Sequence, residues 1–234
     1  MLVIVRAKKI EGLKVGVRNR MICWAIGLGS PVGLYLLIRL LPNGLTASDV
    51  QVLVRQAALI AIPIVWLAWL AIRSPLSPTA IGLAQPRWSD LGWGAGAALT
   101  GIALAVTTSM VLAAWGFTVV ANEQVYGSLA TRPTWLILMI VVGAVISEEA
   151  VFRATVIPAI EAASGSTVLA IAVSTAAFAL PHISYGIAKL PITFAGGLVL
   201  AGVFVWRRSL FATVIAHTLN NLVPLSPVLI RSLS

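Results

Sequence analysis

The chain has 234 residues, of which 59% are hydrophobic and only 10% are charged, and its mean hydropathy is +1.01. This composition excludes a disordered chain, which needs low hydrophobicity and high charge. It also argues against a soluble globular domain, in which about a quarter of the residues are charged. The net charge is +9, but the basic residues are not gathered in a soluble module, so nucleic-acid binding is not expected. The predicted fold class is an all-α, polytopic transmembrane helical bundle.

The first 20 residues hold six basic side chains and one acid, and an apolar run from Met21 to Leu41 follows them. This run is longer than the apolar region of a signal peptide, about 7–15 residues, and predicts a first transmembrane helix. Further apolar runs lie near 50–72, 91–120, 134–160, 164–181, 187–206 and 209–229. Because a helix needs about 20 residues to cross the hydrocarbon, about seven spans are expected. We therefore expect a basic segment over 1–20 and a single transmembrane domain over 21–234, without an internal repeat.

The basic residues also predict an orientation. With the N-terminus in the cytoplasm, ten of them fall on the cytoplasmic side, including Arg73, Arg87, Arg207 and Arg208, and four fall on the other side. Cytoplasmic loops of membrane proteins carry the excess of Lys and Arg. A multi-pass plasma-membrane protein with a cytoplasmic N-terminus is therefore expected.

Three charged residues lie deep in the apolar run 134–160, namely Glu148, Glu149 and Arg153. Each ionised group near the centre of a membrane helix costs roughly 2.5–3.5 kcal/mol. Glu149 and Arg153 are four residues apart, so they share a helix face and can pair. Glu148 lies about 100° round the helix from Glu149, so it does not share that ion pair and is available for catalysis. The alternative is a charge cluster that only fixes helix packing, although buried ion pairs are weak devices for stability.

Two later apolar runs carry the only histidines of the chain. His182 follows Phe178 by four residues, and His217 precedes Asn221 by four, with Asn220 on a neighbouring face. Taken alone, each is explained by an interfacial side chain or by a hydrogen bond between helices. Together with the charged run they supply a base, proton-transfer groups and an amide donor, which is a set for adding water to a carbonyl.

These segments resemble the CPBP family of membrane proteases, which includes CAAX prenyl endopeptidases and the bacteriocin-processing or immunity (ABI) proteins. The motifs Glu-Glu-x-x-x-Arg, Phe-x-x-x-His and His-x-x-x-Asn occur in the family's order, at 148–153, 178–182 and 217–221. The resemblance covers about 134–229, the expected catalytic core. One departure is Ala154, where the family pattern has glycine; it leaves every reactive group in place.

The resemblance implies an intramembrane endopeptidase that hydrolyses a peptide bond with an activated water and needs no cofactor. It assigns Glu148 as the base, His182 as its helper, His217 and Asn221 as oxyanion-binding groups, and Glu149, Arg153 and Phe178 as organisers around them. The implied partners are the lipid bilayer and a peptide or protein substrate at the membrane. Prenylated and bacteriocin-like substrates both stay open.

Three alternatives stay open. Glu148, His182 and His217 are also a catalytic zinc ligand set, although the H-E-x-x-H spacing of zinc proteases is absent. A non-enzymatic immunity or scaffold protein could use the same fold. A proton-coupled transporter could use intramembrane Glu and His as a relay, but the missing repeat argues against it.

Overall fold

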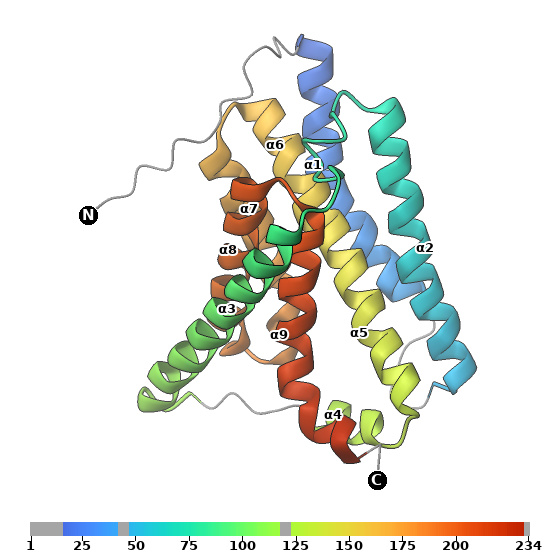
Figure 1. Ribbon diagram of the computed structural model, residues 1–234, viewed down its shortest axis with the longest axis vertical. Helices are drawn as coiled ribbons and strands as arrows, with labels where there is room; N and C mark the ends of the chain where they lie inside the picture. The colour runs from blue at the N-terminus through green and yellow to red at the C-terminus, as the bar shows by residue number, and fades with distance from the viewer. Residues whose placement is uncertain (1–15, 42–46, 118–122, 232–234) are drawn as a thin grey trace.

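The computed structural model describes residues 16–41, 47–117 and 123–231 (Figure 1). Regular structure in these ranges is helical, apart from an isolated bridge between Leu83 and Ser209. Seven helical segments of the described chain are long and apolar enough to cross a membrane, which confirms the predicted all-α bundle. Most of the predicted basic segment 1–20 lies outside the described residues.

The first three spans are α1 (Val17–Leu40), α2 (Asp49–Arg73) and α3 (Trp88–Ala114). α3 lies obliquely to the other long helices (Figure 1). It ends just before Gly116, whose backbone has a φ of 81°. The helix is therefore shorter than the apolar run 91–120 that predicted it, because glycine readily takes the left-handed conformation that stops a helix.

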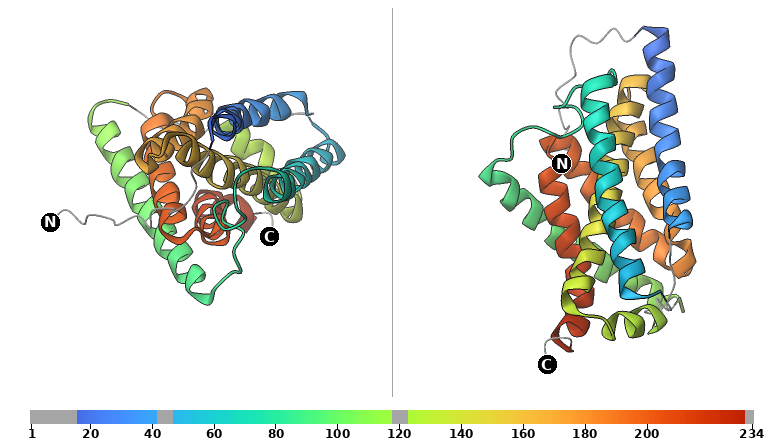
Figure 2. Two further views of the ribbon diagram at one scale, coloured as in Figure 1. Left: turned by 90° about the horizontal axis from the view of Figure 1, so that it is seen from above. Right: turned by 90° about the vertical axis from the view of Figure 1, so that its right-hand side faces the viewer.

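The fourth span combines α5 (Thr134–Glu148), the π-helix η1 (Glu149–Val156) and α6 (Ile157–Ser164), and a short helix, α4 (Glu123–Ala130), precedes it. Within an 18-residue window of this span 56% of the residues are buried, against at most 28% in any other span. Helices α1, α2, α7, α8 and α9 all contact η1, and the view along the bundle shows the fourth span running through it (Figure 2). The π-helix is therefore the centre of the molecule.

The last three spans are α7 (Thr167–Ala179) continued by the 3₁₀ segment η2 (Leu180–Tyr185), α8 (Lys189–Arg207) and α9 (Leu210–Arg231). The segment η2 continues the run predicted at 164–181 as far as Tyr185, and the whole span has 19 residues. The turn from α8 to α9 is tight, and Arg208 in it has a positive φ of 49°.

Apolar side chains pack around the π-helix on more than one side. One cluster joins Phe152 of η1 to Phe178 of α7 and Phe204 of α8. Another joins Ala150 and Ala154 of η1 to side chains of α1 and α2. This packing fixes the backbone from which the three charged residues at 148–153 project.

Candidate functional site

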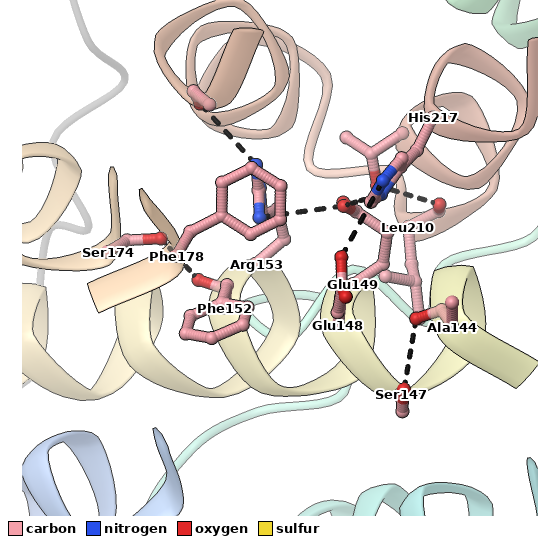
Figure 3. Close-up of polar contacts among 12 residues, drawn as sticks. Ala144, Ser147, Glu148, Glu149, Phe152, Arg153, Ser174, Phe178, Leu210 and His217 are labelled. Atoms are coloured by element: carbon pink, nitrogen blue, oxygen red, sulfur yellow. Dashed lines mark hydrogen bonds and ion pairs between the residues drawn. The ribbon is translucent and has the colours of Figure 1, made fainter. Parts of the chain in front are cut away.

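The charged pair expected within the fourth span is present. Glu149 and Arg153 are both fully buried, and Nη1 of Arg153 lies 3.5 Å from Oε1 of Glu149 (Figure 3). The guanidinium also donates from Nη2 to the carbonyl of Gly197, at 3.5 Å, and lies 4.4 Å from the ring centre of Phe178. Arg153 thus neutralises Glu149 and ties η1 to α7 and α8.

His217 of α9 lies between the two glutamates. Its Nδ1 is 2.8 Å from Oε1 of Glu149, and its Nε2 is 3.6 Å from Oε2 of Glu148 (Figure 3). Because an ionised carboxylate can only accept, the Nδ1–H of His217 donates to Glu149. Glu149 is therefore shared between Arg153 and His217, whereas the sequence spacing predicted only its contact with Arg153. The Glu148 side chain keeps 21% of its surface exposed, so it is the carboxylate that water can reach.

His182 lies in η2 and is partly buried. Its Nδ1 is 3.0 Å from the carbonyl oxygen of Phe178, which can only accept, so His182 donates from Nδ1 and a neutral ring keeps Nε2 as an acceptor. The ring of Phe178 lies 5.3 Å from that of His182 and 5.7 Å from that of His217. Phe178 therefore separates the two histidines. No hydrogen bond or ion pair joins His182 to Glu148 in the described part of the chain.

The two asparagines of α9 differ in their surroundings. Asn220 faces α3, where the missing side chain of Gly101 leaves room for its amide: a Cβ there would come within 2.8 Å of Nδ2. Asn221 follows His217 by one helical turn, is only partly buried, and makes no side-chain hydrogen bond within the described residues. Neither asparagine forms a side-chain hydrogen bond within the described residues; Oδ1 of Asn220 is buried against α3, whereas Asn221 shares the helix face of His217.

Hydrogen bonds that the sequence did not predict hold the π-helix. Thr155 donates to the carbonyl of Ala150, five residues earlier, at 2.8 Å and accepts from Nε1 of Trp66 at 3.1 Å. Ser174 of α7 donates to the carbonyl of Phe152 at 2.6 Å (Figure 3). A π-helix cannot be recognised from hydrophobic periodicity. The one available indication is that π-helical turns often occur at functional sites.

The zinc alternative has little support from the donor arrangement. Among the residues that the structure describes, no three His, Cys, Asp or Glu side chains are gathered so that they could hold a metal ion. Of the three candidates, Glu148 and His217 face each other, whereas no hydrogen bond or ion pair within the described residues joins His182 to either of them. The residues present do not fit a zinc site in this conformation.

Comparison with known proteins gives one match. Residues 130–223 match the family model described as type II CAAX prenyl endopeptidase Rce1-like. No curated protein and no solved structure matches the chain. The matched range includes all three motifs, and so confirms the family resemblance over the segment where the charged and polar residues converge.

Proposed function

We propose that this chain, which over residues 130–223 matches the Rce1-like type II CAAX prenyl endopeptidase family model, hydrolyses peptide bonds with a water activated by Glu148. The family and the seven apolar helices together make it an integral membrane peptidase with a peptide substrate at the membrane. One observation carries the finer proposal. A single imidazole, His217, lies between two adjacent glutamates at the most buried point of the bundle.

Glu148 and Glu149 take different roles because only one of them is accessible. The proton of the attacking water goes to Glu148, whose side chain is partly exposed. Glu149 is enclosed, and its charge is compensated by Arg153 and by His217. It therefore orients the imidazole and leaves the proton transfer to its neighbour.

His217 serves the tetrahedral intermediate in this proposal. Its Nδ1–H is committed to Glu149, so its Nε2 can donate to an oxyanion only when the ring carries both protons. The amide of Asn221, one turn further along α9, is the second proposed oxyanion donor.

The remaining steps follow from the same groups. The water oxygen bonds to the carbonyl carbon, the C–N bond breaks, and Glu148 returns the proton to the leaving amine. His182 helps by accepting a hydrogen bond from the water at Nε2, because its Nδ1–H is held by Phe178. We place the catalytic core at 134–229, the N-terminus in the cytoplasm and the protein in the plasma membrane.

The test is cleavage of fluorogenic peptides, prenylated and unprenylated, by the purified full-length protein in liposomes. Glu148→Gln should lower the rate at least 100-fold, the scale of general-base catalysis. Asp49→Asn, at an exposed acid that begins α2, is the control and should retain the rate. Equal rates for wild type and Glu148→Gln would overturn the base assignment.

Two further outcomes separate the alternatives. No cleavage across the panel by well-folded protein would favour an immunity or scaffold protein. Stoichiometric zinc in the purified protein, with activity lost on chelation, would replace the metal-free mechanism by the zinc one. The same panel decides whether cleavage requires a prenylated peptide.

A further inference from the structure

An apolar cavity of about 580 Å³ lies between α2, the α5–η1 segment and α9. Its walls include Ile64, Ala68, Ile146 and Val214, and residues of the loop around Leu83 also line it. No charged side chain among the described residues lines it, and its volume is that of a small-molecule pocket. The cavity contains none of the candidate catalytic residues, so the hydrolytic mechanism does not account for it.

A smaller cavity of about 180 Å³ adjoins it, since Ala84 lines both. Three arginines line this second cavity, Arg87, Arg207 and Arg208, together with the carboxylate of Asp90. Asp90 is already engaged, because it accepts from Arg207 at 2.9 Å and from the backbone N–H of Arg87 at 3.0 Å. An anion entering this cavity therefore meets a carboxylate whose charge is compensated.

Two of these arginines keep donors for a ligand. Arg87 is exposed and forms no ion pair with the described residues. Arg208 pairs with Glu161 through Nη2, but its Nη1 is buried and has no hydrogen-bond partner among the residues that the structure describes. Arg208 also has a positive φ, in a position where glycine is the usual residue. A strained backbone conformation of this kind is a reason to look for a function.

Exposed tryptophans indicate the depth of the two cavities. Trp88, Trp93 and Trp206 are all exposed near the arginine-lined cavity, and the rings of the last two lie 6.2 Å apart. Tryptophan is enriched at the level of the lipid headgroups. Val214, in the wall of the apolar cavity, lies about 6 Å deeper along α9 than the first residue of that helix. The polar cavity is thus at headgroup depth, and the apolar cavity extends from it into the hydrocarbon.

We propose that the two cavities together bind one anionic phospholipid, its phosphate at Arg87 and Arg208 and an acyl chain in the apolar cavity. The order of the two environments matches this ligand, with basic donors at headgroup depth and an uncharged wall below. The occupant is a lipid rather than free phosphate, because phosphate leaves the apolar cavity unexplained. The acyl chain would contact Ala150, so the bound lipid packs against the π-helix next to Glu149.

The test measures lipid retention and does not depend on proteolysis. The full-length protein is equilibrated with detergent micelles containing equal phosphatidylglycerol and phosphatidylcholine, and the lipid that stays bound is counted by native mass spectrometry. One phosphatidylglycerol per chain should be retained. Arg87→Gln should weaken its retention about fivefold, the effect of one basic residue on an anionic lipid. Ala68→Phe, which fills the apolar cavity, should weaken it at least as much.

Matched controls make each result decisive. Arg73→Gln removes an exposed arginine from the same end of the bundle but outside both cavities, and Ala61→Phe enlarges an exposed alanine of α2 outside them. Both controls should retain the lipid as wild type does. If Arg87→Gln and Arg73→Gln lost phosphatidylglycerol equally, the retention would depend only on general surface charge, and the proposed site would be wrong. Unchanged retention in Ala68→Phe, or displacement of the lipid by inorganic phosphate alone, would also overturn it.

Discussion

Glu148 and Glu149 are neighbours in the sequence, yet only Glu149 is fully enclosed, with Arg153 as its ion-pair partner. Replacing Glu149 by Gln leaves a buried guanidinium without its counter-charge. We expect a loss of about 3–5 kcal/mol in the free energy of unfolding, and less than about 1 kcal/mol for Glu148→Gln. Unfolding in detergent against denaturant measures both. Similar losses in the two variants would show that the pair does not divide the structural and catalytic roles.

Gly197 provides a second prediction at a single position. A Cβ on Gly197 would lie 3.0 Å from the ring of Phe178 and 3.1 Å from the side chain of Thr175, whereas nothing lies within 4 Å of a Cβ on Gly196. Gly197→Ala should therefore cost about 1–3 kcal/mol and reduce cleavage, because Phe178 packs on both histidines. Gly196→Ala is the control and should be neutral or slightly stabilising. Thermal unfolding and the cleavage rate of each variant test this prediction. A Gly197→Ala variant as stable as Gly196→Ala would contradict the close packing of Gly197 against Phe178 and Thr175.

The sequence predicted part of this site and missed another part for a physical reason. The four-residue spacing of Glu149 and Arg153 predicted their pairing, and the ion pair confirms it. The contact of His217 with both glutamates depends on how α9 lies against η1, which no spacing within one helix can give. The catalytic roles stay predictions, and for Asn221 and His182 no hydrogen bond or ion pair with Glu148 is present within the described residues.

Among the elements, the π-helix η1 is the one that sequence periodicity did not predict. The side-chain hydroxyl of Thr155 donates to the carbonyl of Ala150, five residues earlier, and accepts a hydrogen bond from Nε1 of Trp66 in α2. Thr155→Val keeps the shape but leaves the indole N–H unpaired, so we expect a loss of about 1–3 kcal/mol and slower cleavage. The control is Thr175→Val, because the hydroxyl of Thr175 is buried without a hydrogen-bond partner and its removal should cost nothing. Equal stability of both variants, measured by denaturant unfolding, would show that the hydroxyl does not support the π-helix.

For the whole molecule, hydropathy predicted the spans well because each has to bury its backbone in hydrocarbon as a helix. The observed ends differ from the apolar runs by a few residues, where a capping glycine or a 3₁₀ segment intervenes. The helix α4 was not expected, since its eight residues are too few to span a bilayer.

The proposed orientation gives a prediction at this scale. Ser77 and Thr131 are exposed in connections that an odd number of spans separates from each other. In a Cys23→Ala background, Ser77→Cys should react with an impermeant maleimide from the cytoplasmic side, and Thr131→Cys from the opposite side. Labelling of sealed vesicles of known orientation tests this, and the reverse pattern would refute the cytoplasmic N-terminus.

The contact between the α2–α3 loop and the α8–α9 turn has a consequence for biogenesis. The backbone N–H of Leu210 donates to the carbonyl of Gly82 at 3.0 Å, and Leu83 bridges to Ser209. These partners are about 126 residues apart in the chain. At about 5–20 residues per second, the loop waits roughly 6–25 s during synthesis before its partner emerges. During that interval the first spans lie in the membrane without the contact between the α2–α3 loop and the α8–α9 turn. We therefore expect quality-control factors to recognise an incompletely synthesised chain at this stage.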